Sequence, residues 1–263
     1  MNDLILRENA DNGVCTLTLN SEANRNALSK QMLAILLENI ESVSNDPAVR
    51  VVIIKAKGPA FCAGHDLREI NEHRKDPDHG ILFFKSLMAL CKQTMLAIIN
   101  TPKPVIAQVN GVATAAGCQL VASCDLAYAS ETARFSTPGV HIGLFCSTPM
   151  VALSRNVATK HAMEMLLVGD MVSASDAQAI GLINRCVSGS DLQKTIDEVA
   201  GKIANKSGDT LKVGKHAFYE QQTMKVDDAY HYASEVMVTN LLTEDAREGI
   251  SAFLEKRAPD WRS

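Results

Sequence analysis

The sequence has no paired-cysteine motif and no surplus of positive charge. Its seven cysteines include no Cys-x-x-Cys pair. An odd number of cysteines, several of them in apolar surroundings, is typical of buried thiols in a reducing compartment. The net charge is −4, so the chain lacks the basic excess that would neutralise nucleic-acid phosphates. We therefore expect neither a disulfide framework nor a nucleic-acid partner.

Long apolar runs and leader-like features are also missing. No uncharged apolar run reaches about 18 residues, the length that a membrane-spanning helix requires. Residues 1–7 contain no basic segment followed by a long apolar one, so they do not resemble a signal peptide. We therefore expect a cytoplasmic protein with no membrane partner.

The residues that are present have the composition of a globular protein. Hydrophobic residues make up 46% of the 263 residues and charged residues 21%, which is enough for one large domain with a smaller helical appendage. Residues 4–8 and 14–20 are β-rich and flank an Asn12-Gly13 turn, which predicts a hairpin. Ser29 is suited to cap an amphipathic helix that runs to about residue 44.

Strand and helix patterns then alternate along the chain. Nearly continuous apolar runs at 49–56 and 105–109 predict buried strands, and shorter strands are expected at 125–129 and 133–136. Helices are expected at 81–99, at 118–123 and from 150 almost to the end, apart from a strand-like segment at 182–187. Residues 61–66 and 137–148 are expected to be loops, and the polar stretch 71–80 a mobile surface loop. This order predicts an α/β fold, and neither G-x-G-x-x-G nor G-x-x-x-x-G-K-[ST] occurs in it, which excludes those phosphate loops.

Two segments of the chain share one design. In residues 51–67 and again in 105–120, a buried strand ends, small residues follow, and a helix begins. Free N–H groups at helix starts attract negative charge, and small side chains let a ligand approach the backbone. Two such N–H groups from different loops can bracket one oxygen as an oxyanion hole. The alternative is that the small residues serve only tight helix–strand packing.

The same two segments resemble a known family. Residues 61–67 (Phe-Cys-Ala-Gly-His-Asp-Leu) resemble the first motif of the crotonase, or enoyl-CoA hydratase/isomerase, superfamily, and residues 109–120 with Cys124-Asp125 resemble the second. Residues 24–28 resemble the Asn-Ala-Leu turn of the family, 169–182 the stretch after its active site, and 248–257 its C-terminal helix. The resemblance covers nearly the whole chain, in order.

The resemblance implies a fold, a ligand and an assembly. It implies a ββα spiral core over residues 1–200, with the acyl-CoA site, and a helical oligomerisation region over 201–263. It also implies CoA thioesters as substrates or ligands, a role in fatty acid metabolism, no required cofactor, and a homotrimer or a dimer of trimers. No metal site is expected, because His65, His73 and His79 lack a close ligand pattern.

The resemblance also assigns residues. By match, the N–H groups of Ala63 and Ala116 would hold the thioester oxygen. Lys256 matches a basic residue that reaches CoA phosphate from a neighbouring subunit in relatives, although a solvated helix charge is the alternative. The residues that match CoA contacts near the first motif are Arg25, Ala27, Ala60, Ala63, Gly64, His65, Asp66 and Leu67.

The sequence departs from the family at the positions of the acid–base residues. Hydratases of the family usually carry two glutamates, which suit proton transfer near neutral pH; here Gln119 and Gly139 stand at those positions. Gln119 can orient a water but cannot shuttle a proton. His65 and His141 are candidate replacement bases, each with a structural hydrogen-bonding role as the alternative. Asp66 has the alternative role of capping the following helix.

Two functional hypotheses follow from these departures. The first is an enoyl-CoA hydratase/isomerase family enzyme, lyase-type, in which an oxyanion hole works with noncanonical acid–base residues; decarboxylation and thioester hydrolysis also suit such a site. The second is a binding protein that kept the acyl-CoA pocket and lost turnover. A thiol nucleophile at Cys62 or Cys146 would need a nearby base to activate it.

Overall fold

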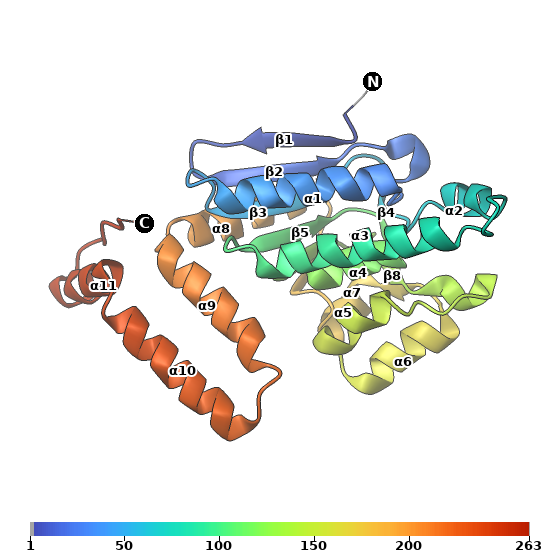
Figure 1. Ribbon diagram of the computed structural model, residues 1–263. Coiled ribbons are helices and arrows are strands. Elements are labelled where there is room, and N and C mark those ends of the chain that lie inside the picture. Colours follow the sequence, from blue (N-terminus) through green and yellow to red (C-terminus); the bar gives the residue numbers. More distant parts are fainter. Residues whose placement is uncertain (1–2, 263) are drawn as a thin grey trace.

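The computed structural model describes residues 3–262 and contains two β-sheets (Figure 1). The larger sheet has the strand order β1-β2-β3-β5-β7-β10 and the smaller one β4-β6-β8-β9. The strands of the larger sheet are β1 (Ile5–Asn9), β2 (Val14–Leu19), β3 (Val51–Ala56), β5 (Val105–Val109), β7 (Leu126–Ser130) and β10 (Arg185–Val187). Those of the smaller sheet are β4 (Ala60–Cys62), β6 (Val112–Thr114), β8 (Arg134–Ser136) and β9 (Val172–Ser173).

The chain builds both sheets together, one strand of each per turn. Strand β3 is followed at once by β4, β5 by β6, and β7 by β8, and helices then return the chain to the larger sheet. All pairings are parallel except the predicted β1–β2 hairpin and the β8–β9 pair. This arrangement confirms the α/β class and the predicted spiral of ββα units.

Eleven α-helices complete the described part of the chain. They are α1 (Lys30–Asn45), α2 (Leu67–His73), α3 (Ile81–Asn100), α4 (Ala116–Ser123), α5 (Pro149–Asn156), α6 (Thr159–Val168), α7 (Ala174–Ala179), α8 (Leu192–Ala204), α9 (Gly208–Gln221), α10 (Val226–Leu241) and α11 (Glu244–Glu255). Short 3₁₀ helices lie at η1 (Glu22–Asn24) and η2 (Pro138–Ile142). The predicted cap of α1 is confirmed, since Ser29 Oγ accepts a hydrogen bond from the Met32 N–H at 3.1 Å.

Both faces of the larger sheet are buried. On one face, Val52 and Ile54 of β3 join the core cluster that includes residues of α1, α3 and α4. On the other face, Val51 and Ile53 pack in a second cluster with Leu192 and other residues of α8. Two buried faces favour apolar residues on both sides of a strand, which explains why β3 and β5 are nearly continuous apolar runs.

The predictions are wrong for three of the four strands of the smaller sheet, whereas β8 was predicted at 133–136. Strand β4 lies in a segment predicted as loop, β6 in the run of small residues, and β9 in a segment predicted as helix. Two or three residues cannot show an alternating pattern, and these strands exist only because distant segments pair with them. The predicted loop at 71–80 is wrong in its first part, because α2 extends to His73; that residue bonds Asp76 at 2.8 Å and its ring stacks on Phe83 at 3.7 Å.

Helix α3 is long and apolar enough to cross a membrane by length and composition alone. It contacts α1 and α4, and one side of it is buried in the main core through residues such as Leu87, Cys91 and Ile98. That burial is what a core helix requires, so the helix gives no support for a membrane partner.

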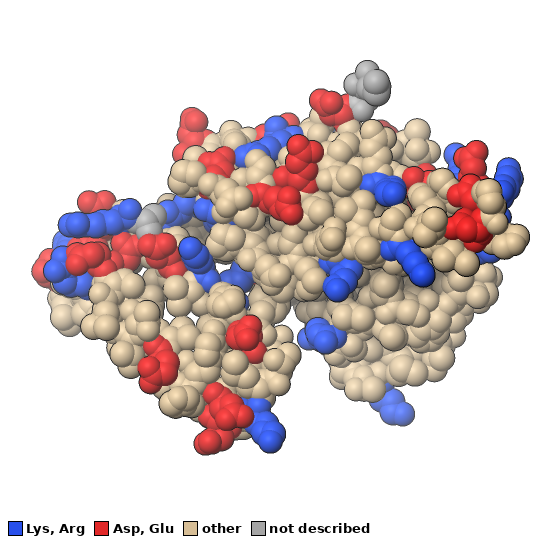
Figure 2. All heavy atoms as spheres, viewed as in Figure 1, with Lys and Arg blue, Asp and Glu red and all other residues tan. Residues whose placement is uncertain are grey.

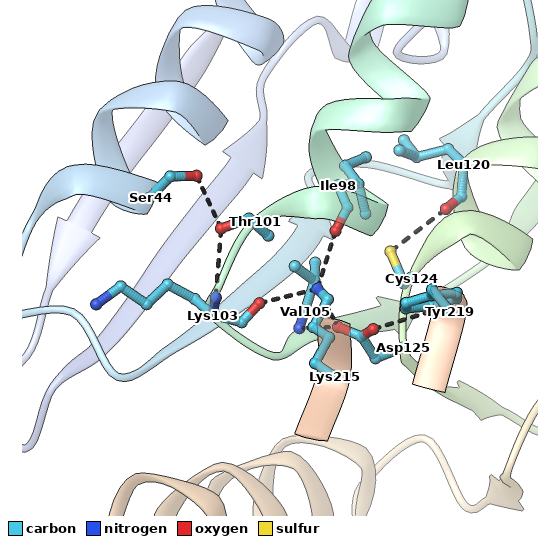
Figure 3. Close-up of polar contacts among 10 residues, drawn as sticks. All are labelled: Ser44, Ile98, Thr101, Lys103, Val105, Leu120, Cys124, Asp125, Lys215 and Tyr219. Atoms are coloured by element: carbon cyan, nitrogen blue, oxygen red, sulfur yellow. Dashed lines mark hydrogen bonds and ion pairs between the residues drawn. The ribbon is translucent and has the colours of Figure 1, made fainter. Parts of the chain in front are cut away.

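Helices α9, α10 and α11 extend away from the sheets as an arm (Figure 1). A polar network joins this arm to the core (Figure 3). Lys215 Nζ of α9 lies 2.7 Å from Asp125 Oδ2 and donates to the carbonyl oxygens of Ile98 and Lys103, both at 3.0 Å. The Tyr219 hydroxyl donates to Asp125 Oδ1 at 2.9 Å. Because Lys215 is largely buried, these contacts offset the cost of removing its charge from water.

The two predicted domains meet inside a helix. The boundary between residues 200 and 201 falls within α8, which packs on the sheet as a core element. The outermost residues of the two predicted ranges, 1, 2 and 263, lie outside the described residues. The division into two domains stays a prediction.

Candidate active site

The described residues form a cavity of about 500 Å³. Its walls come from the start of α2, the first half of α3, the start of α4 and the segment that follows β8. Most of the wall is apolar, with residues such as Phe84, Met88 and Phe145. The polar or titratable residues of the lining are His65, Arg74, His141, Cys146, Ser147 and Thr148.

The turn at residues 24–28 holds the loop that follows β4. Arg25 and Asn26 have φ angles of 51° and 52°, and Asn26 is fully buried. Its Nδ2 donates to the carbonyl oxygens of Lys57 at 2.9 Å and Ala60 at 2.8 Å, while its Oδ1 accepts from the Ser21 N–H at 2.8 Å. The amide is thus satisfied on both ends, and it locks the turn against the β3–β4 connection.

This turn uses the Ala63 N–H, which corrects one predicted role. The Ala63 N–H donates to the Arg25 carbonyl oxygen at 3.1 Å, so it is not free to bind a thioester oxygen. The Leu28 N–H donates to Gly64 O at 2.7 Å and Leu28 O accepts from the Asp66 N–H at 3.4 Å. The N–H of His65 lies between these two bonds and has no backbone acceptor within residues 3–262. The Gly64 N–H likewise has no backbone acceptor there, but it bonds the Cys62 sulfur, which leaves the His65 N–H as the free donor.

The second donor comes from a strained turn. Ala115 has φ 51° and ψ −120°, a combination that glycine adopts easily and alanine rarely. It is held there because its N–H donates to Ser136 O at 2.9 Å and its carbonyl accepts from the Gln119 N–H at 3.0 Å. The next residue, Ala116, begins α4, and the first N–H groups of a helix have no partner inside it.

Two glycines bring these loops together. A Cβ added to Gly64 would lie 2.9 Å from Ala115 Cβ and 3.4 Å from the Ala116 nitrogen. A Cβ added to Gly117 would lie 2.2 Å from the Cys62 carbonyl oxygen. The small residues therefore serve close backbone packing, which brings His65 and Ala116 to the lining of one cavity. The packing interpretation of these residues is confirmed, and the oxyanion hole stays a prediction.

The two positions that lack glutamates are arranged differently from each other. Gln119 is 6% exposed, its Oε1 lies 3.9 Å from the Cys91 thiol, and it is not among the described residues that line the cavity. Gly139 does line it, but an added Cβ would lie 2.7 Å from Leu144 O and 3.0 Å from the Cys146 sulfur. The space for a longer side chain at 139 is therefore filled by the chain itself.

The cysteines around the site are protonated. Burial raises the pKa of Cys62 and Cys118 to about 12 and that of Cys91 to about 11. Burial also raises the pKa of Cys146, the cysteine that lines the cavity. Thiols in this state are poor nucleophiles.

The remaining predicted contacts lie in three places. Leu67 and His65 line the cavity, whereas Ala60 is buried below it and Arg25 is exposed. Asp66 caps α2, since its Oδ1 accepts from the Arg68 N–H at 2.9 Å and the Glu69 N–H at 3.3 Å. Lys256 ends α11 with φ 58° and is exposed on the arm. Its contact with CoA stays a prediction, as do those of Arg25, Ala27, Ala60, Gly64 and Asp66.

Comparison with known proteins agrees with the fold. The model of the enoyl-CoA hydratase/isomerase family matches residues 9–263. The crystal structure of an enoyl-CoA hydratase from Mycobacterium smegmatis has a TM-score of 0.95 and 48% identity, with both chains fully covered. The human mitochondrial enoyl-CoA hydratase domain-containing protein 3 is 45% identical over 95% of this chain and 80% of its own. The 2,3-dehydroadipyl-CoA hydratase of Escherichia coli is 34% identical over 95% of both chains.

The comparisons also correct the predicted location and establish the family. Relatives from Xenopus laevis, Homo sapiens and Rattus norvegicus, 44% to 45% identical, are named mitochondrial proteins, which points to mitochondria and contradicts the cytoplasm. Reduced thiols are expected in the cytoplasm and in other reducing compartments alike. The prediction about a signal peptide rested on residues 1–7, of which residues 1 and 2 lie outside the described residues. With fold, paired loops and relatives in agreement, the chain belongs to the enoyl-CoA hydratase/isomerase family of the crotonase superfamily.

Proposed function

We propose that this protein binds an acyl-CoA thioester and polarises its carbonyl with the N–H groups of His65 and Ala116. The observation that carries the proposal is the contact of Gly64 with Ala115 and Ala116. It brings His65 and Ala116 to the lining of one cavity, and this supports a shared role for their N–H groups. Each such donor contributes about 3 to 4 kcal/mol to the stabilisation of an oxyanion.

The cavity wall suits an acyl chain. Apolar side chains from α2, α3 and the segment after β8 surround the polarised position, and their contact with an aliphatic chain contributes about 0.8 kcal/mol per methylene buried. We propose a lyase-type enzyme of the hydratase/isomerase family in which residues other than the two glutamates move protons. The reaction needs no bound cofactor, because the oxyanion hole and a positioned base supply its chemistry.

A second candidate is an acyl-CoA-binding protein without turnover, and the occupied space beside Gly139 favours it. A CoA-thioester decarboxylase or hydrolase would also suit a site with an oxyanion hole and no paired carboxylates. These candidates differ in products, so one panel separates them. The purified protein is incubated with enoyl, 3-hydroxyacyl, malonyl-type and saturated acyl-CoA, products are followed by mass spectrometry, and binding is followed by calorimetry.

Each outcome of the panel supports one candidate. Water added to an enoyl-CoA, or lost from a 3-hydroxyacyl-CoA, supports the lyase. Loss of carbon dioxide supports the decarboxylase and free CoA the hydrolase. Binding without products supports the binding protein. No binding of any thioester contradicts the whole proposal.

We also propose that the chain assembles as a homotrimer or a dimer of trimers. The arm exposes large apolar side chains, among them Leu242 and Phe253, both 82% exposed. A further group, Met163, Leu167 and Val168, is exposed on α6, in a region that carries few charged side chains (Figure 2). Apolar surface on this scale is typical of association sites. Sedimentation velocity gives the mass of the assembly, and a monomer at micromolar concentration would contradict this proposal.

A further inference from the structure

The His65 side chain has one satisfied and one unsatisfied nitrogen. Its Nδ1 lies 3.3 Å from the Leu28 carbonyl oxygen. A carbonyl oxygen only accepts, so Nδ1 carries the proton and Nε2 has a free lone pair. Nε2 is buried and has no hydrogen-bond partner among the described residues, and His65 is one of the residues that line the cavity. A buried acceptor with no partner calls for an explanation.

The protonation state of this ring suits a base. Burial lowers the pKa of His65, while the bond to the Leu28 carbonyl acts in the opposite direction. The ring is therefore neutral near pH 7, and its tautomer is fixed by Leu28. The lone pair of Nε2 is available to take a proton.

We propose that His65 Nε2 moves the proton of the substrate α-carbon, in place of the two missing carboxylates. This inference rests on the proposed function, because the thioester carbonyl must be held by the N–H groups of His65 and Ala116. Nε2 takes the α-proton, and the electrons of the C–H bond form the double bond of an enolate. The negative charge moves to the thioester oxygen, and the reverse step returns the proton to carbon.

The same nitrogen can serve hydration. A water molecule loses a proton to Nε2 while its oxygen bonds to the β-carbon of an enoyl thioester. The electrons of the carbon–carbon double bond move into the enolate, and the imidazolium then gives its proton to the α-carbon. One base acts twice, and the sum is the addition of one water.

Other groups that face the cavity are less suited to this role. The Arg74 guanidinium has no acceptor atom, and burial raises the pKa of the Cys146 thiol. His141 is exposed, and a Cβ added to Gly169 would lie 2.9 Å from its Nε2, so that nitrogen faces the Gly169 turn. The carboxylate of Asp66 accepts two N–H bonds from the start of α2. Among the titratable lining groups, His65 alone combines a fixed tautomer with a buried free lone pair.

The test is exchange of the α-protons of hexanoyl-CoA in deuterium oxide, followed by mass spectrometry. His65→Gln keeps the backbone N–H, so it removes the base without removing the oxyanion donor. His161→Gln, an exposed histidine of α6, is the matched control. We expect His65→Gln to slow the exchange about 100-fold or more and His161→Gln to leave it unchanged. His65→Asn is the second variant, and circular dichroism checks that both fold.

The pH profile gives a readout that a structural role would not move. In the unmodified protein the exchange rate should rise with pH through one ionisation below about 6.5, the ordinary histidine value, and this step should vanish in His65→Gln. Exchange at an unchanged rate in His65→Gln overturns the inference, and so does exchange that is lost in His141→Gln instead. Hexanoyl-CoA binding without exchange also overturns it and leaves the carbonyl-binding proposal standing. No binding of hexanoyl-CoA or other thioesters overturns both.

Discussion

The loop after β4 and the segment after β8 form opposite walls of the cavity and are built in opposite ways. In the first, glycine and alanine bring backbone against backbone until an added methyl group would collide with Ala115. In the second, Leu144 and Cys146 fold back and fill the place beside Gly139. The first wall consists of Ala63 and His65, whereas the second presents mainly apolar surface and an exposed histidine.

This difference separates the two halves of the chemistry. Carbonyl polarisation depends on backbone geometry, which every residue type supplies if the turn is correct. Proton transfer depends on particular side chains, and Gln119 and Gly139 stand where the family resemblance predicts glutamates. A chain can therefore keep the first half while the second changes, and each half can be disturbed independently.

The largest expected effect comes from disturbing the backbone packing on which carbonyl polarisation depends. Gly117→Ala should lower the free energy of unfolding by about 2 kcal/mol or more, because its Cβ would meet the backbone of Cys62, which cannot move aside cheaply. Gly201→Ala in α8 is the matched control, since nothing lies within 4 Å of the added Cβ. It should gain about 0.5 to 1 kcal/mol from helix propensity. Urea denaturation of both variants measures the difference, and equal stabilities would show that the two loops are not tightly packed.

The next prediction concerns the filled wall. Gly139→Glu should cost about 1 to 3 kcal/mol from overpacking against Leu144 O and Cys146, and it should not produce hydratase activity. Gly189→Glu, with nothing within 4 Å of the added Cβ, should stay within about 0.5 kcal/mol of the unmodified protein. Thermal melts and a crotonyl-CoA hydration assay test both. A stable Gly139→Glu variant that hydrates crotonyl-CoA would show that the space beside Gly139 is open.

Gln119→Glu tests whether a carboxyl group at this buried position can take part in proton transfer. A carboxyl buried at this position should have a pKa above its ordinary value, so the unfolded chain is the state that ionises more easily. The variant should therefore match the unmodified protein near pH 4 and lose about 1 to 3 kcal/mol as the pH rises toward 8. Melting temperatures at pH 5 and pH 8 give this slope. A flat difference, or a gain of hydratase activity, would show that Gln119 has access to water and substrate.

The smallest effect concerns His65 itself. Its folded pKa lies below the unfolded value, so the unfolded chain binds more protons at acidic pH. Its contribution to stability is complete above about pH 6.5 and is lost as the pH falls toward the folded pKa. The stability of His65→Gln should therefore depend less on pH between 5 and 7 than that of the unmodified protein. Parallel pH profiles would contradict a buried, neutral ring.

The sequence was sufficient for the parts of the fold that follow from periodicity. The apolar runs of β3 and β5, the Asn12-Gly13 hairpin and the cap at Ser29 each rest on local patterns that tertiary contacts leave unchanged. Strands β4, β6 and β9 could not be predicted, because two or three residues become a strand only when a distant partner lies beside them.

The site was predictable to within a few residues. The helix was predicted from residue 118 and begins at Ala116, and Ala63 was assigned as a free donor although the turn at Arg25 uses its N–H. That bond joins residues 38 positions apart and leaves no local pattern. The filled space beside Gly139 and the unpaired nitrogen of His65 likewise depend on side-chain positions that spacing does not give.

The central claim is that two backbone N–H groups polarise a bound thioester carbonyl. The infrared band of hexanoyl-CoA, carrying carbon-13 at that carbonyl, measures the polarisation without requiring turnover. We predict that the band moves to lower frequency on binding to the unmodified protein, because hydrogen bonds weaken the C=O bond. The shift should remain in His65→Gln, which keeps both donors, and should diminish in Gly64→Ala, which displaces them. A bound thioester whose band stays at its position in water would contradict the account.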